Sequence, residues 1–196
     1  MKAIKTYTDD ALLNHVKSLP SFKGIPSGLW ILGVRSRADN YDMYDDKFYI
    51  FRSTNFVDVM TGTTNSGGYG LLNFAAWNKN GVAHVKSDEW YYNVWNVGKH
   101  KNKVKALVQV KPFKIYRDNN KNKQSGDVPE KAWQWEDWIG INFHPNTYNL
   151  NSKVITWMIG GWSVGCQVVN DTLKFKKFIE NLGDQRQFTY CLIDEF

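Results

Sequence analysis

The sequence predicts a mainly β (α+β) domain, a mixed sheet or β-sandwich with two peripheral helices. Most of the chain consists of short runs of β-branched and aromatic residues separated by turn-forming residues, a pattern typical of strands. Only two segments carry apolar residues at helical spacing. With 196 residues the chain is long enough to bury one proper core, so we expect a single domain over residues 1–196.

The first helix is expected over residues 8–19, TDDALLNHVKSL. Thr8 and the acidic residues after it are typical of a helix N-cap, and Pro20 ends the segment. Apolar residues lie between these signals at the spacing of one helical face. The second helix is expected over residues 171–183, where the same spacing recurs and Gly183 forms the C-terminal cap.

Eight runs between and after these helices are expected to form strands, mostly antiparallel. They are LWILGVRS (29–36), KFYIFRST (47–54), GVAHVKS (81–87), KALVQVKPFKIYR (105–117), DWIGINFH (137–144), KVITWMIGG (153–161), CQVV (166–169) and FTYCLID (188–194). The run at 153–161 is apolar on both faces, which predicts a central, rigid strand.

Two connecting segments have the composition of functional loops. Residues 60–70, MTGTTNSGGYG, are rich in Gly, Ser and Thr, as in a polar binding loop, and Thr64 is its candidate contact. Residues 117–138 are long for a connection in a compact domain, so we expect a surface loop or a lid.

Charge and cysteine content limit the function classes. The net charge is +6, and the excess basic residues lie mainly in 99–105, 117–123 and 174–177. Such a surface attracts anionic polymers such as nucleic acid or cell wall, or simply keeps the protein soluble.

No run reaches the roughly 18 apolar residues of a membrane span, and no signal peptide is apparent. Two cysteines make no disulfide framework, although one Cys166–Cys191 bridge stays open.

His144 and Cys166 are the candidate catalytic pair. Alternation along 137–144 places Ile141 and Phe143 on the core face, so Asn142 and His144 are expected to face a polar groove or solvent. The Gly-rich turn GGWSVGC delivers Cys166 at its end. A free thiol has a pKa of about 8.5, so a nucleophilic cysteine needs a neighbouring imidazole.

The pattern of His144-Pro-Asn followed by Gly-Gly-Trp-Ser-Val-Gly-Cys166-Gln resembles the signature of the L,D-transpeptidase (YkuD-like) family, in which His precedes Ser/Thr-His-Gly-Cys. The resemblance covers residues 139–169, and residues 1–45 have no counterpart. It implies that Cys166 is the acylated nucleophile and His144 its base. The amides of Gly165 and Cys166 would form the oxyanion hole.

Neighbouring residues complete the candidate site. Ser163 matches the family's Ser/Thr, while Trp162, Asn142 and Gln167 are the candidate substrate contacts. Two positions depart from the pattern. Val164 replaces the second histidine and Val168 stands where the family carries Arg or Asn, so a different acyl donor is expected.

The sequence therefore predicts a cysteine-dependent acyl-transfer enzyme that acts on peptidoglycan stem peptides, with hydrolysis favoured over cross-linking. We expect no metal and no cofactor. Synthesis in the cytoplasm without a signal peptide would suit a protein of a virion or one released at lysis. A non-catalytic cell-wall, glycan-binding or phage structural module that keeps the fold stays open, as does a buried, structural Cys166.

Other chemistry receives little support. His84 and His100 lack metal-ligand spacing to any cysteine or carboxylate pair, and no nucleotide-binding motif appears, so nucleic acid is an unlikely partner. Glu136 and Asp137 could form a glycosidase pair, but neighbours in a strand point to opposite faces.

Overall fold

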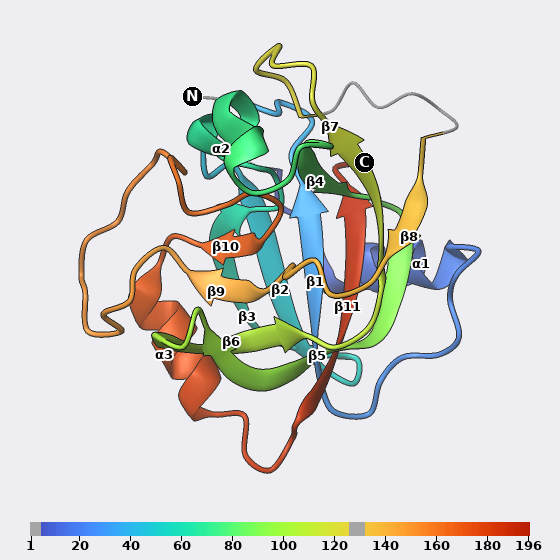
Figure 1. Ribbon diagram of the computed structural model, residues 1–196. Helices are drawn as coiled ribbons and strands as arrows, with labels where there is room; N and C mark the ends of the chain where they lie inside the picture. Colours follow the sequence, from blue (N-terminus) through green and yellow to red (C-terminus); the bar gives the residue numbers. More distant parts are fainter. Residues whose placement is uncertain (1–4, 126–131) are drawn as a thin grey trace.

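A computed structural model describes residues 5–125 and 132–196 and shows a mainly β protein built on a closed barrel (Figure 1). In order around the barrel, the strands are β1 (Leu29–Arg35), β11 (Gln187–Asp194), β5 (Glu89–His100), β6 (Val104–Gln109), β9 (Phe143–Pro145), β10 (Gln167–Val169), β3 (Asn55–Thr63) and β2 (Asp46–Arg52). A second sheet contains β4 (Val82–Val85), β7 (Phe113–Asp118) and β8 (Gln134–Glu136).

The described residues form three short α-helices around the barrel, α1 (Asp9–Ser18), α2 (Gly68–Asn73) and α3 (Thr172–Glu180), and a 3₁₀ turn (Phe74–Ala76) follows α2. In Figure 1, α1 and α3 lie on opposite sides of the barrel and α2 lies near one end. No helix among the described residues has the length and apolar character needed to cross a membrane.

Aromatic side chains fill the barrel. Trp95 stacks on Phe143 with ring centroids 5.6 Å apart, and Tyr190 approaches Trp95 at 4.7 Å. On the outside, α1 buries Leu12 and Val16 in a second cluster that includes Trp30 and Trp90. Full burial of each such aliphatic side chain stabilises the fold by about 1.5–3 kcal/mol before entropy is counted.

The mainly β class, the mixed sheet and both expected helices are confirmed, but the sheet closes into a barrel rather than forming a sandwich. The C-terminal cap of α3 is Asn181, so the cap expected at Gly183 is wrong. Thr8 caps α1 by accepting from the amide of Ala11, and Asp171 caps α3 by accepting from Lys174, as the cap signals indicate. The expectation of mostly antiparallel pairing holds for most of the barrel. Two pairs are parallel, β1 with β11 and β9 with β10, so the sheet is mixed.

Two expected strands are wrong, and the run expected over 105–117 is divided between β6 and β7, which belong to different sheets. Residues 153–161 form no strand beyond one isolated bridge between Met158 and Met43, and Val154 and Met158 are 66% and 64% exposed. In 137–144 only the last two residues join β9. The barrel closes through β9, β10 and β3, so it offers no edge on which an apolar segment such as 153–161 could pair.

Two expected loops are also partly wrong. Residues 60–70 contain the end of β3 and the first residues of α2 rather than a continuous loop. In 117–138, the first two residues belong to β7 and residues 134–136 form β8. Residues 126–131, and with them that part of the expected lid, lie outside the described part of the chain.

Candidate functional site

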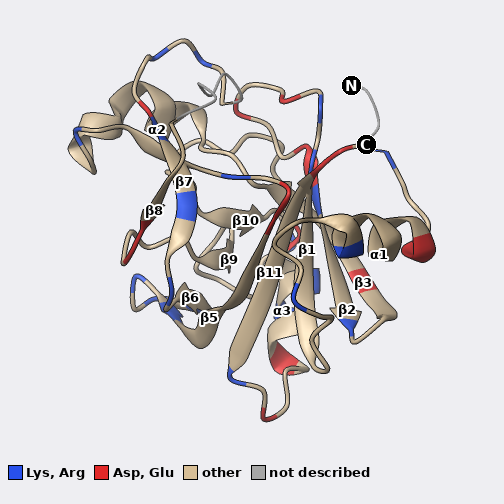
Figure 2. Cartoon of the chain, turned by 90° about the vertical axis from the view of Figure 1, so that its right-hand side faces the viewer, with Lys and Arg blue, Asp and Glu red and all other residues tan. Residues whose placement is uncertain are grey.

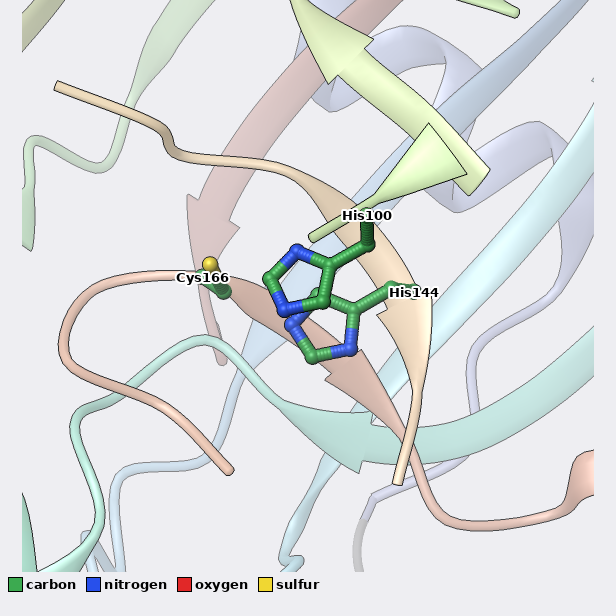
Figure 3. Close-up of side chains that lie close together, drawn as sticks. All are labelled: His100, His144 and Cys166. Atoms are coloured by element: carbon green, nitrogen blue, oxygen red, sulfur yellow. The ribbon is translucent and has the colours of Figure 1, made fainter. Parts of the chain in front are cut away.

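The barrel brings His144 and Cys166 together and adds a third residue, His100 (Figure 3). Strands β9 and β10 are parallel neighbours that pair His144 with Val168, and Cys166 comes directly before β10. His100 ends β5, and its ring stacks on that of His144 with centroids 3.8 Å apart and planes 18° apart. One nitrogen of each histidine and the Cys166 sulfur all lie within 4.8 Å of one another.

A backbone carbonyl fixes the tautomer of His144. Its Nδ1 lies 2.8 Å from the Pro145 carbonyl oxygen, which can only accept, so Nδ1 carries the proton and Nε2 carries the lone pair. His144 Nε2 is buried and has no hydrogen-bond partner among residues 5–125 and 132–196. The free lone pair of His144 is therefore available inside the cluster.

A chain of amides orients His100. The side-chain amide of Asn142 donates to His100 Nδ1 at 3.0 Å, and its oxygen accepts from the backbone amide of Gln109 at 3.0 Å. The side-chain oxygen of Gln109 in turn accepts from the backbone of Ile141 at 2.9 Å. Because the Gln109 amide fixes which end of Asn142 accepts, Asn142 positions His100 in this structure.

Burial keeps all three groups neutral near pH 7. It lowers the pKa of His144 to about 3, with the neighbouring His100 adding to the effect, and lowers that of His100 to about 4, with a contribution from Lys101. Burial also raises the pKa of the Cys166 thiol to about 11, although the backbone amide of Asn142 partly opposes this. The thiol donates to the Gly140 carbonyl oxygen at 3.2 Å. The resting site therefore holds a thiol beside an imidazole rather than an ion pair.

Ser163 shapes the turn that leads to Cys166. Its hydroxyl donates to the Cys166 carbonyl at 2.9 Å and accepts from the Gly165 amide at 3.2 Å. Gly165 has φ +132°, and a Cβ there would lie 2.8 Å from Ala83 atoms, so only glycine fits. The Gly165 amide already donates to Ser163, so of the two amides expected in the oxyanion hole only that of Cys166 remains for it.

An open pocket of about 390 Å³ reaches Cys166 from solvent. Its lining includes Trp77, Trp138, Phe74 and Arg117. Trp138 is 79% exposed, and Arg117 is held by an ion pair with Glu136, which lowers the pKa of that carboxyl. Because Glu136 is paired with Arg117, it is not available for a glycosidase pair with Asp137. The pocket therefore has an aromatic rim, and the charge of its Arg117 is neutralised by Glu136.

Two of the predicted substrate contacts are occupied within the protein. Gln167 is fully buried, its oxygen accepts from the Tyr190 hydroxyl at 2.6 Å, and its amide donates to the Gly165 carbonyl. Trp162 packs against the apolar cluster that contains Cys166 and meets Tyr148 edge-on at 5.1 Å. Neither lines the open pocket, so we do not retain them as substrate contacts.

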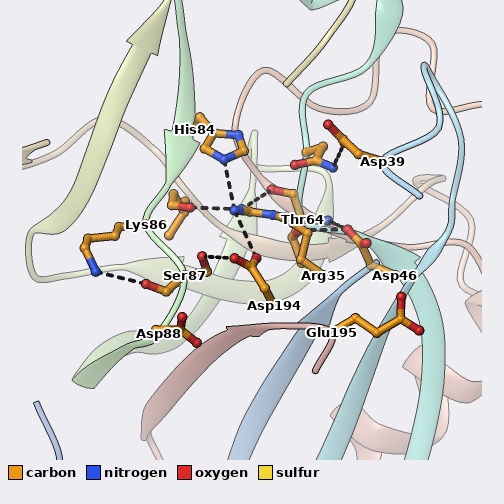
Figure 4. A network of polar contacts seen from close by, with 12 residues as sticks. Arg35, Asp39, Asp46, Thr64, His84, Lys86, Ser87, Asp88, Asp194 and Glu195 are labelled. Carbon is orange, nitrogen blue, oxygen red and sulfur yellow. Dashed lines mark hydrogen bonds and ion pairs between the residues drawn. The ribbon is translucent and has the colours of Figure 1, made fainter. Parts of the chain in front are cut away.

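Thr64 belongs to a separate, buried polar network (Figure 4). Its hydroxyl donates to Asp46 at 2.7 Å and accepts from Arg35 at 2.9 Å. Arg35 also contacts His84 at 2.9 Å and donates to the Val85 carbonyl. Every polar group of Thr64 that could meet a ligand is thus used to hold β3 against β1 and β2.

Two expectations about the other candidate groups are corrected, and the open question of a disulfide is answered. His144 is fully buried rather than facing a groove, because the ring of His100 covers the side of β9 that was expected to be open. His100 was set aside for lack of sequence spacing, yet β5 delivers it to the site. Cys166 and Cys191 are both free thiols, so the bridge between them is absent.

On the side of the molecule drawn in Figure 2, the described Lys and Arg residues do not form one cluster. Figure 2 shows Lys and Arg on several separate strands and loops, with acidic residues between them. This distribution gives no defined track for an anionic polymer on the face in view.

Comparisons with protein-family models, curated proteins and solved structures found no match to this chain. What the chain does must therefore be argued from the geometry of the site.

Proposed function

We propose that this chain is a cysteine-dependent acyl-transfer enzyme of the L,D-transpeptidase-like type, with that family's β-fold. The observation that carries the proposal is the environment of His144. A backbone carbonyl holds the proton of the ring on Nδ1, and the unpartnered Nε2 lies in the same cluster as the Cys166 sulfur. This arrangement suits a nucleophile and its general base.

The proposed reaction begins with a neutral pair. As Cys166 Sγ attacks the substrate carbonyl carbon, its proton moves to His144 Nε2. A C–S bond forms, the C–N bond breaks, and the amine leaves with the proton from His144. Water then attacks the thioester carbonyl carbon and gives a proton to His144 Nε2. A C–O bond forms, the C–S bond breaks, the carboxylic acid leaves, and the proton on His144 returns to the sulfur to restore the thiol. Because burial disfavours a preformed thiolate, proton transfer accompanies the attack rather than preceding it.

The pocket favours a peptide substrate and hydrolysis. Cys166 forms part of the lining of an open cavity, so an extended acyl donor and water both reach the sulfur. The rim residues Trp77 and Trp138 offer flat apolar faces for the substrate. Peptidoglycan stem peptides, or similar peptides with D-centres, are the substrates that we propose.

The test is incubation of the protein with stem peptides that carry D-residues, followed by chromatography and intact-protein mass spectrometry. We expect peptide release and an acyl adduct on Cys166, both lost in Cys166→Ser and retained in Cys191→Ser. Turnover that survives Cys166→Ser would contradict the proposal. So would the absence of both adduct and turnover over the peptide set.

A second candidate is a non-catalytic glycan-binding module, favoured by the exposed aromatic rim. Trp77 and Trp138 are 48% and 79% exposed beside the pocket, and tryptophan faces stack on sugar rings. Sedimentation with purified peptidoglycan distinguishes the two. The binding module requires affinity that Trp138→Ala weakens and Cys166→Ser leaves unchanged, without any peptide release by the unaltered protein.

A further inference from the structure

We propose that His100, His144 and Cys166 form a binding site for one divalent transition-metal ion of the Zn²⁺ class. The inference goes beyond the acyl-transfer proposal and does not depend on it. Two imidazoles and one thiol from β5, β9 and the turn before β10 converge at one point inside the barrel wall (Figure 3).

The distances suit a single ion. The three candidate ligand atoms lie within 4.8 Å of one another. Zn–N bonds of about 2.0–2.1 Å and Zn–S bonds of about 2.3 Å place two donors on a tetrahedral ion about 3.5 Å apart. Closing the cluster onto a metal therefore needs movements on the order of 1 Å, within reach of side-chain adjustments.

A second observation points to a missing ligand. His144 Nε2 is buried and lacks a hydrogen-bond partner within the described ranges, 5–125 and 132–196. A buried polar atom without a partner costs about 1–3 kcal/mol. A metal ion would supply that partner, and the bond from Nδ1 to the Pro145 carbonyl is the outer contact that typically orients a metal-bound histidine.

The donor set selects the kind of ion. Imidazole and thiolate are ligands for Zn²⁺ and its chemical relatives, whereas Mg²⁺ and Ca²⁺ prefer oxygen, and no carboxylate belongs to this cluster. Three protein ligands leave a fourth position for water, as in catalytic zinc sites. Cys166 also lines the open pocket, which gives the ion a route of entry.

Binding of the ion can be written with every proton and electron pair accounted for. The Cys166 S–H bond breaks, the proton leaves to solvent, and the sulfur donates an electron pair to the ion without any redox change. At His100 the metal must replace the hydrogen bond from Asn142 at Nδ1 or shift the ring to its other tautomer. The metal-bound form has no free Nε2 on His144 and no free sulfur, so the ion would block thioester formation.

The test uses full-length protein freed of metal by a chelator and kept reduced. Co²⁺ serves as the spectroscopic probe and Zn²⁺ as its competitor. We expect one Co²⁺ per chain, the intense visible bands of a tetrahedral site with a sulfur-to-cobalt charge-transfer band, and displacement by one equivalent of Zn²⁺.

Variants distinguish binding at the His100–His144–Cys166 cluster from nonspecific binding at the protein surface. Cys166→Ser should lose the charge-transfer band, and His100→Gln should weaken Zn²⁺ binding at least about 10–100-fold, the loss typical of removing even an outer-shell partner. Cys191→Ser and His15→Gln are the matched thiol and imidazole controls and should bind as the unaltered protein does. Circular dichroism confirms that each variant folds. If His100→Gln does not fold, the comparison of Cys166→Ser with Cys191→Ser decides the question.

Octahedral, weak Co²⁺ binding that Cys166→Ser leaves unchanged would overturn the inference, as would no binding. Failure here is distinguishable from failure of the acyl-transfer proposal. The chelator-treated protein can be assayed for a Cys166 adduct whether or not it binds an ion.

Discussion

Asp46 offers the sharpest test of the polar network that holds Thr64. This buried carboxylate begins β2 and accepts from the Ser36 amide at 2.8 Å, the Thr64 amide at 2.6 Å and the Thr64 hydroxyl at 2.7 Å (Figure 4). Asp46→Ala leaves two buried amides without an acceptor, at about 1–3 kcal/mol each. We therefore expect the free energy of unfolding to fall by about 2–6 kcal/mol.

The pH dependence of this loss has a definite sign. Burial, together with the nearby Asp45, raises the pKa of Asp46 in the folded state above its unfolded value. The folded protein then binds the proton more tightly than the unfolded chain. Its contribution to stability is complete below the unfolded pKa of about 3.9 and declines as the pH rises through the folded pKa. The gap between unaltered protein and Asp46→Ala should be larger at pH 4 than at pH 7.

Urea unfolding at several pH values measures both the loss of unfolding free energy and its dependence on pH. Substitution of the exposed Asp184 by Ala is the control and should change the free energy of unfolding by less than about 0.5 kcal/mol. Asp46→Ala as stable as the unaltered protein, or a gap that widens with rising pH, would refute the reasoning. Either result would mean that Asp46 does not hold Thr64 as described, and Thr64 would again be a candidate ligand contact.

Three further predictions concern the turn, the second thiol and the rim. Gly165→Ala should lower the free energy of unfolding by about 1–3 kcal/mol because of its positive φ and the close approach of Ala83, whereas Gly161→Ala, with no neighbour inside 3.8 Å, should cost less in the same urea titration. Cys191 belongs to the apolar cluster that α1 forms with Trp30 and Trp90, and Cys191→Ala should lower the free energy of unfolding by about 1–2 kcal/mol by opening a small cavity there. Mass spectrometry should show unchanged labelling of Cys166, and faster or slower labelling would show that the two thiols are coupled. Trp138→Ala should leave stability within about 0.5 kcal/mol, and a larger loss in thermal unfolding would mean that this exposed ring packs in solution.

Local signals in the sequence predict much of the fold. The caps at Thr8 and Asp171 mark the starts of α1 and α3, and the runs that became β1, β2 and β11 have few residues that disfavour strands. The Gly-rich turn at Gly165 is also visible in the sequence, and the motif that contains His144 and Cys166 predicts that the two residues lie close together. The parallel β9–β10 pair that brings them together was not predicted.

The rest depends on contacts between distant parts of the chain. Val154 and Met158 have the apolar character of a strand, but they lie outside the closed barrel, and Met158 makes only an isolated bridge to Met43. His100 is 44 residues from His144, and only the path of β5 around the barrel brings it into the site. Burial of Gln167 likewise depends on Tyr190, which arrives from β11. No local pattern encodes these encounters.

The central claim is that His144 acts as the base for Cys166, and iodoacetamide labelling of the metal-free protein tests it without a substrate. Labelling rates of both cysteines are followed by peptide mass spectrometry for the unaltered protein and for His144→Phe, which keeps a flat ring over His100. The account predicts that Cys166, which borders the pocket, is labelled much faster than the fully buried Cys191. It also predicts that His144→Phe slows Cys166 at least about 10-fold while Cys191 is unchanged. Equal Cys166 rates in the two proteins would contradict it.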